Sequence, residues 1–187
     1  NSYQKLNDFF KDHKVVKSKA NNGYAAGHKI AVNYGIENKF DFIWVLNNDL
    51  TVRKETLQKL LLAYNSYGTG IYGSITLKSE NPDVVNFGGG NTDDINEEFD
   101  YNAYDGYLLE NYYKKTKLRK VQSVEGSSML IPLEVIKEHG FMREDFFMYG
   151  EETDYCYRLK KLGISSYIIP GSIVVHKGAE SFKDNKH

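Results

Sequence analysis

Three carboxylates fall within four residues at Glu151, Glu152 and Asp154, directly after an aromatic run and Gly150. Crowded acids at the point where a loop becomes a helix could supply a general base or hold a metal ion. The same pattern is typical of an ordinary helix N-terminus, where the helix dipole stabilises each acid by about 0.3–1 kcal/mol. The cluster therefore has a catalytic and a structural interpretation, which the rest of the chain has to separate.

Helical geometry separates the three acids. Glu151, Asp154 and Arg158 stand at positions i, i+3 and i+7, and the last two form an i,i+4 pair of the stabilising orientation. We expect these residues on a charged face, with Asp154–Arg158 as a structural ion pair. Glu152 instead aligns with the apolar stripe Tyr155, Cys156, Leu159 and Leu162. A carboxylate on an inward face is desolvated and becomes more basic, so Glu152 is the predicted base.

Two further polar groups follow predicted strands. Asn47-Asn48-Asp49 ends the apolar run 41–46, and His176 directly follows the strand-like residues 172–175. Ligands of open α/β sheets bind beyond the carboxyl ends of the strands. Asp49 and His176 would suit an Mg²⁺ or Mn²⁺ ion carried mainly by a phosphate ligand, because such sites use only one or two protein groups. The alternatives are an Asx turn or helix cap at Asp49 and a surface or hydrogen-bonded histidine at 176.

A glycine-containing turn spans residues 21–27, Asn-Asn-Gly-Tyr-Ala-Ala-Gly. Such a turn could let the backbone approach a phosphate or a base closely, and a plain turn is the alternative. It lacks the lysine of a P-loop and the three-glycine spacing of a dinucleotide fingerprint. Nucleophilic catalysis has little support, because Cys156 lies within a predicted helix on the apolar stripe and no Gly-x-Ser-x-Gly elbow occurs.

Composition excludes several classes of protein. The 187 residues carry 24 Lys and Arg against 25 Asp and Glu, a net charge of −1, so nothing points to nucleic acid as a partner. One cysteine excludes a disulfide framework and favours a reducing, cytoplasmic setting. No apolar run approaches the roughly 18 residues of a membrane span. The chain begins without methionine inside a predicted helix, so we expect an excised fragment of a longer protein.

Hydrophobic periodicity predicts alternating helices and strands. We expect helices at 3–12, from the glycine turn to about 38, at about 54–67, at 132–140 with Pro132 at its first position, and from 151 to 163. We expect strands at 15–16, 41–46, 70–77, 121–125, 127–131, 164–169 and 172–175, with 78–119 as short strands and loops inserted across one end of the sheet. This alternation predicts one α/β domain over residues 1–187, a sandwich around a mostly parallel sheet.

The ordered set of motifs resembles family 2 glycosyltransferases with the GT-A fold. The front half is matched by Asn21-x-Gly23-Tyr24-Ala25-x-Gly27 and by the strand that ends Leu46-Asn47-Asn48-Asp49. The back half is matched by Gly126-Ser127-Ser128-Met129-Leu130-Ile131, by Phe146-Phe147-x-Tyr149-x-Glu151-Glu152-x-Asp154-x-x-x-Arg158, by Gly163 and by Val174-Val175-His176. Each motif is short, and it is their order and spacing over most of the chain that is specific.

The resemblance implies a role for each matching residue. Asp49 would hold a divalent cation, Mg²⁺ or Mn²⁺, on the donor diphosphate, and His176 would complete the metal site. The Glu151–Glu152 pair stands where the family usually has Glu-Asp, so a glutamate would act as the general base of an inverting transfer. The implied donor-binding residues are Asn21, Gly23, Gly27, Asn47, Asn48, Asp49 and Gly126. His28-Lys29 departs from the Asn often found after the glycine motif.

The implied partners are a nucleotide-sugar donor and a saccharide or lipid-linked acceptor, with residues 78–119 expected to influence acceptor choice. A bacterial polysaccharide role follows from the family alone, and peripheral membrane association through other parts of the protein stays open. Family members begin with two strands that precede the first residue here, so the sequence is expected to be N-terminally truncated. The alternatives are an inactive GT-A-like binding or scaffold domain and, with less support, a metal-dependent phosphohydrolase.

Overall fold

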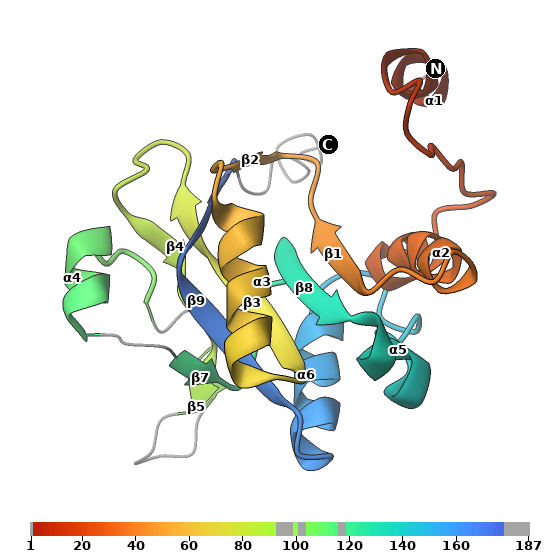
Figure 1. Cartoon of the computed structure of the whole chain (residues 1–187). Helices are drawn as coiled ribbons and strands as arrows, with labels where there is room; N and C mark the ends of the chain where they lie inside the picture. The colour runs from red at the N-terminus through yellow and green to blue at the C-terminus, as the bar shows by residue number, and fades with distance from the viewer. Residues whose placement is uncertain (1, 93–98, 101–103, 116–118, 178–187) are drawn as a thin grey trace.

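A seven-stranded mixed sheet forms the centre of the molecule in the computed structural model, which describes residues 2–92, 99–100, 104–115 and 119–177. Its main path runs β1 (Phe42–Leu46), β8 (Ser128–Pro132), β3 (Gly70–Lys78), β9 (Ser165–His176) and β2 (Leu50–Val52). β4 (Val85–Phe87) pairs with β3 and β7 (Arg119–Val121) with β9, while β5 (Asn91–Thr92) and β6 (Phe99–Asp100) form a separate pair. Figure 1 shows the arrangement of these strands.

The predicted α/β class is confirmed, but the sheet is mixed rather than mostly parallel. β3 and β9 pair in parallel, whereas the other five pairings described in this sheet are antiparallel. The predicted parallel direction of the strands was wrong because a continuous apolar run, as in β1, indicates only that both faces of the strand are buried. Such burial does not determine the direction in which the neighbouring strand runs.

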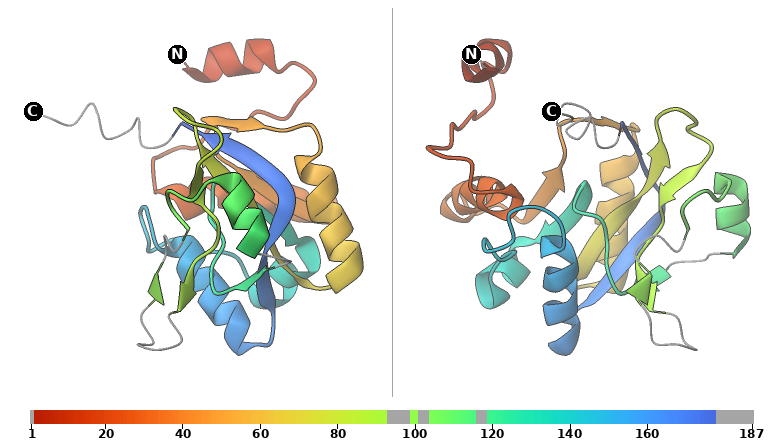
Figure 2. Two further views of the ribbon diagram at one scale, coloured as in Figure 1. Left: turned by 90° about the vertical axis from the view of Figure 1, so that its left-hand side faces the viewer. Right: turned by 180° about the vertical axis from the view of Figure 1, so that it is seen from behind.

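Helices cover both faces of the sheet, as Figures 1 and 2 show. On one face α3 (Thr56–Tyr67) packs Leu60 and Ala63 against Tyr72 of β3 and Leu130 of β8. On the other face lie α2 (Tyr24–Glu37), α5 (Leu133–His139) and α6 (Glu151–Lys161), which bury apolar side chains in the larger core cluster. The predicted three-layer sandwich is therefore confirmed.

Several boundaries depart from the predictions. β9 is one strand where two were expected: its register against β3 jumps from Ile169 to Ile173, and Gly171 in the intervening bulge has φ +84°. Pro132 is the last residue of β8 and the N-cap of α5, not its first helical residue. Residues 15–16 form no strand, because no described strand lies beside them to complete a ladder.

The region 78–119 contains the predicted short strands together with a helix that periodicity did not indicate, α4 (Leu109–Lys115). Four acidic residues of this region, Asp93, Asp94, Glu97 and Glu98, lie outside the described residues. The predicted strand 121–125 is displaced, since β7 ends at Val121.

The first helix, α1 (Ser2–Phe9), projects from the body of the molecule in both figures. Its apolar side chains are largely exposed, with Phe9 at 80% and Leu6 at 48%. Among the described residues, no helix combines the length and apolar character that crossing a membrane requires.

Candidate active site

A cavity of about 490 Å³ brings together residues that lie far apart in the sequence. Seven predicted site residues line it: Asn47, Asn48, Asp49, Gly126, Glu151, Glu152 and His176. The other seven lining residues were not predicted as site residues: Tyr24, His28, Leu46, Glu125, Ser127, Met148 and Tyr149. The polar groups predicted at strand ends and at the opening of α6 therefore share one site.

Asp49 and His176 meet because β2 pairs with the end of β9. Leu50 lies opposite His176 in this antiparallel ladder, and the backbone N–H of Lys177 donates to the carbonyl of Asp49 over 3.2 Å. His176 Nε2 is consequently 3.1 Å from Asp49 Oδ1. The side chains are 12% and 31% exposed respectively, so both remain accessible from the cavity.

Glu125 lies on the other side of His176. Its Oε2 accepts hydrogen bonds from the hydroxyls of Thr76 and Ser127, each at 2.6 Å, and its Oε1 is 3.9 Å from His176 Nδ1. The imidazole ring is thus flanked by two carboxylates. The sequence carried a usable signal for Glu125, because it closed a predicted strand just as Asp49 and His176 do.

The first turn of α6 places both glutamates of the predicted acid pair in a buried position. Glu152 is 7% exposed, as its inward-facing stripe predicted, but Glu151 is only 3% exposed. The expectation that Glu151 lies on a charged outer face is therefore wrong. Helical periodicity predicts which side of a helix is buried. The N-terminal end of α6 instead points at the cavity, so both Glu151 and Glu152 line it.

The environment of Glu151 disfavours its charge. Burial raises the pKa of its carboxyl group, and Oε2 is buried without a hydrogen-bond partner among the described residues. Two consecutive left-handed residues, Tyr149 with φ +71° and Gly150 with φ +91°, turn the chain into the helix just before it. A tyrosine in this conformation is sterically costly, and such strain is concentrated at functional sites.

Tyr24, the first residue of α2, connects three parts of the site. Its hydroxyl donates to the carbonyl of Gly126 over 2.7 Å, and its backbone N–H donates to the carbonyl of Phe147 over 2.9 Å. Burial, followed by the nearby charge of Glu152 and the other carboxylates, raises the pKa of the Tyr24 phenol far above its ordinary value. Tyr24 therefore stays a hydrogen-bond donor throughout the physiological range of pH.

His28 packs one helical turn beyond Tyr24, with the ring centroids 4.4 Å apart. Burial lowers the pKa of its imidazole group, so the neutral form is favoured. The neutral ring lines the cavity and can both donate and accept hydrogen bonds there.

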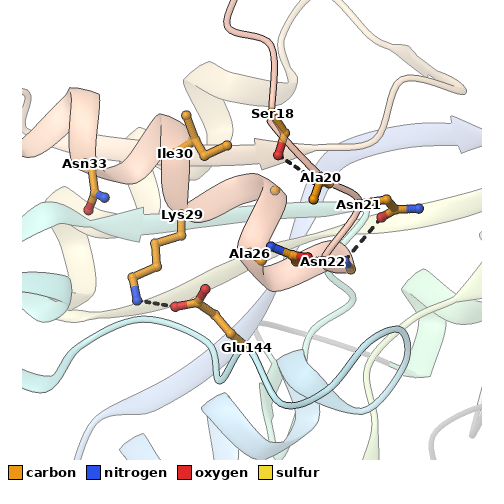
Figure 3. A pocket seen from close by; sticks show the side chains of 11 residues that line it. Ser18, Ala20, Asn21, Asn22, Ala26, Lys29, Ile30, Asn33 and Glu144 are labelled. Carbon is orange, nitrogen blue, oxygen red and sulfur yellow. Dashed lines mark hydrogen bonds and ion pairs between the residues drawn. The ribbon is translucent and has the colours of Figure 1, made fainter.

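Asn21, Gly23 and Gly27 line a different cavity, of about 640 Å³, shown in Figure 3. Its wall includes the ion pair between Lys29 and Glu144. The Gly23 N–H donates to Asn21 Oδ1 over 3.2 Å, which forms an Asx turn and fits the alternative of a plain turn at residues 21–27. The structure does not place these three residues with the acidic and histidine side chains.

The two glycines of this turn differ in their surroundings. Gly23 has φ +91°, and a Cβ there would lie 2.2 Å from the carbonyl oxygen of Phe147. Gly27 has no atom within 4 Å of the corresponding position. Packing therefore requires glycine at 23, whereas it gives no reason for glycine at 27.

The predicted structural ion pair is present. Arg158 Nε donates to Asp154 Oδ2 over 2.8 Å, and the same guanidinium donates to the carbonyl of Phe141 over 3.3 Å. Asp154 does not line the cavity, so of the three crowded acids two face the site and one supports the helix.

The Asp49–His176 pair is chemically compatible with a divalent cation. It offers one carboxylate oxygen and one imidazole nitrogen side by side on the cavity wall. Within the described part of the chain, no three His, Cys, Asp or Glu side chains are grouped as a complete metal site. Two protein donors with an open side suit an ion that takes its remaining ligands from phosphate oxygens and water.

Comparison with known proteins is consistent with the predicted class. No protein-family model matches the chain. The chain is 28% identical over 151 residues to the low-salt glycan biosynthesis hexosyltransferase Agl10 of Haloferax volcanii. The aligned region covers 80% of the chain and 47% of the relative, so the chain spans about half the length of that protein.

The structure is also similar to that of GalNAc-T7, solved with UDP, GalNAc and Mn²⁺. The TM-score is 0.68 at 16% sequence identity, and the similarity covers 92% of this chain and 34% of the other. At this identity the likeness concerns the fold. The chain has the α/β fold of a GT-A glycosyltransferase.

Proposed function

We propose that the chain is the catalytic portion of an inverting glycosyltransferase, which transfers a sugar from a nucleotide-sugar donor to an acceptor hydroxyl. The observation that carries the proposal is the single cavity that holds the Asp49–His176 pair together with Glu151 and Glu152. The hexosyltransferase name of the relative and the UDP, GalNAc and Mn²⁺ bound by the structural neighbour support the same reaction class.

Asp49 and His176 would hold the divalent cation of the donor. When bound, this ion supplies positive charge that stabilises the departing nucleoside diphosphate. The protein contributes the placement of the two ligands, which depends on the β2–β9 pairing and on the turn directly after β1.

Glu152 is the proposed general base. A sugar hydroxyl is a poor nucleophile, so its proton has to move to a basic group as the oxygen attacks the anomeric carbon. The new glycosidic bond forms on the face opposite to the breaking bond between that carbon and the diphosphate oxygen, which inverts the configuration. Burial raises the pKa of the neighbouring Glu151, so its carboxyl group ionises less readily than that of an exposed glutamate.

Donor binding can be tested by thermal-shift titration with UDP, GDP and dTDP, each with and without Mn²⁺. We expect a Mn²⁺-dependent increase in melting temperature with one of the nucleotides. Asp49→Ala should weaken this response at least tenfold in nucleotide concentration, since it removes one of two ligands. A response in Asp49→Ala that equals that of the wild type would contradict the ligand assignment.

The base assignment is tested by assaying sugar transfer with the donor whose nucleotide gives the thermal shift. Glu152→Gln should abolish transfer while leaving the nucleotide and Mn²⁺ response intact, because the amide keeps the shape of the side chain and loses its basicity. Glu138→Gln, on the exposed end of α5, serves as the matched control. Turnover at the wild-type rate in Glu152→Gln would refute the assignment.

The second candidate is a GT-A-like binding domain without turnover. The glutamate at 152, where aspartate is the usual base, is the observation that favours it. This alternative predicts nucleotide and Mn²⁺ binding by the wild type but no transfer with any donor.

A further inference from the structure

We propose that Glu125 is a positioning residue of this site, which holds the imidazole ring of His176 so that Nε2 is presented to the cation. The inference rests on the proposed function for its metal, but its geometric core is independent of catalysis. None of the motifs that suggested a glycosyltransferase includes Glu125.

Glu125 is anchored before it reaches His176. Thr76 on β3 and Ser127, just before β8, both donate to Oε2 at 2.6 Å. Thr76 is fully buried and Ser127 is 3% exposed, so neither donor is displaced easily by water. An ionised carboxylate accepts hydrogen bonds only, and two short ones fix the plane of the group.

The other oxygen of the same carboxylate faces the ring. Oε1 is 3.9 Å from Nδ1, while Nε2 is 3.1 Å from Asp49 on the opposite side. The side chains of Glu125 and His176 are 17% and 12% exposed, which leaves little room for the ring to rotate. Glu125 thus lies where it can act on Nδ1 without competing for Nε2.

This arrangement matters when Nε2 binds a cation. A coordinating nitrogen must present its lone pair, so the ring proton has to reside on Nδ1. The Nδ1–H group of a histidine ligand usually donates a hydrogen bond to a carboxylate or carbonyl group, which fixes the tautomer and the ring orientation. The distance of 3.9 Å between Nδ1 and Glu125 Oε1 is longer than a hydrogen bond. A small movement of the ring would let Oε1 accept a hydrogen bond from Nδ1–H.

The contacts of Glu125 also distinguish it from an ordinary structural glutamate. Glu134 likewise accepts from a threonine hydroxyl, Thr69 Oγ1 at 2.8 Å, but its contact is exposed and it does not line the cavity. Glu134→Gln therefore changes the same chemical group in a similar hydrogen bond away from His176, and serves as the matched control.

The test compares Glu125→Gln with Glu134→Gln and the wild type. Two-bond ¹H–¹⁵N correlation spectra of the metal-free proteins report the state of each ring nitrogen of His176. Titration with Mn²⁺ in the presence of the nucleotide that gives the thermal shift, with free Mn²⁺ measured by electron paramagnetic resonance, reports metal affinity. Melting temperature shows whether each variant folds.

We expect Glu125→Gln to shift the Nδ1 resonance of His176 and to weaken Mn²⁺ binding by about 10–100-fold, whereas Glu134→Gln changes neither. Glu125→Gln should keep a melting temperature close to that of the wild type, because the amide retains its contacts with the two hydroxyls. A loss of stability without a change in metal affinity would mean that Glu125 is structural, and would overturn the proposal.

The remaining outcomes are also decisive. An unchanged Nδ1 resonance in folded Glu125→Gln overturns the proposal regardless of the metal result. If Glu125→Gln shifts the Nδ1 resonance but the wild type binds no Mn²⁺ with UDP, GDP or dTDP, the proposed function is refuted and the positioning of His176 by Glu125 is supported. If Glu125→Gln fails to fold, Thr76→Val releases one anchor of the carboxylate and should weaken Mn²⁺ binding in the same direction; unaltered affinity there overturns the proposal.

Discussion

Replacing each glycine of the Asn21–Gly27 turn by alanine should change stability in opposite directions. Gly23 has φ +91° and faces the Phe147 carbonyl, whereas Gly27 is exposed within α2 and its Cβ would meet no atom. The family resemblance gives both glycines the same donor-binding role. The structure therefore separates two residues that the motif treats as equivalent.

The cost of Gly23→Ala has two parts. Gly23 combines φ +91° with ψ −176°, a backbone conformation used almost only by glycine, and a residue with a Cβ there costs about 1–3 kcal/mol. A Cβ only 2.2 Å from the Phe147 oxygen must also push that carbonyl away, which breaks its 2.9 Å hydrogen bond with the Tyr24 N–H and costs about 0.5–1.5 kcal/mol. With residual strain in the loop, the free energy of unfolding should fall by about 2–4 kcal/mol, or roughly 4–16 °C in melting temperature.

Gly27→Ala is the matched control. Alanine in an exposed helical position should raise the free energy of unfolding by about 0.5–1 kcal/mol. Urea unfolding of the three proteins, followed by circular dichroism, measures both changes. The prediction is contradicted if Gly23→Ala is as stable as the wild type, or if the free energy of unfolding changes with the same sign in both variants. A raised KM for the donor in Gly27→Ala, without a loss of stability, would support direct contact with the donor.

Three further predictions concern single side chains. Tyr24→Phe leaves the buried carbonyl of Gly126 without its donor and should cost about 1–3 kcal/mol in urea unfolding; an unchanged midpoint would contradict this. Glu151→Met should stabilise the protein by about 1 kcal/mol at pH 7, because it removes a buried carboxyl group whose Oε2 has no hydrogen-bond partner among the described residues. Burial raises the pKa of Glu151 above its ordinary value of 4.5. Below that pH the carboxyl group is protonated in both the folded and the unfolded protein, and as the pH rises its ionisation destabilises the folded state. The stability advantage of Glu151→Met over the wild type should therefore shrink near pH 4. Cys156 is fully buried with a raised thiol pKa, so a thiol reagent should label it only in denaturant, and labelling of the native protein would contradict its burial.

The part of the site that could be predicted from the sequence followed from one rule about sheets. Polar residues directly after an apolar strand are expected at the edge where ligands bind, and Asp49 and His176 indeed lie 3.1 Å apart. Helical spacing likewise predicted the burial of Glu152 and the pairing of Asp154 with Arg158. Each of these residues was identified from its position within its own strand or helix, together with a general rule about where such positions lie.

The features that escaped prediction depend on contacts between distant segments. The three residues of β2 pair with the end of β9, and so short a strand has no periodicity of its own. Glu125 stood at the end of a predicted strand, but its anchor is Thr76, 49 residues earlier in the chain, and no spacing within one segment indicates that contact. The burial of Glu151 arises in the same way, because helical spacing cannot indicate which segments enclose the start of α6.

The role of Gly23 shows the same limit from another direction. Its motif suggested that the backbone approaches a donor phosphate or base, yet the group closest to a Cβ at this position is the carbonyl of Phe147. A glycine required by packing and a glycine required by a ligand look identical in one sequence. Only the partner distinguishes them.

Tyr24 has a consequence for how this protein could be altered. One residue holds the start of α2, the chain at Gly126 and the loop at Phe147 together. Substitutions in any of these segments will therefore change the position of the other two, and their effects will not add. A laboratory selection for a new donor or acceptor would have to vary the three segments in one library. A variant selected in one segment alone would fit the present position of Tyr24, and a later change in another segment would shift that position.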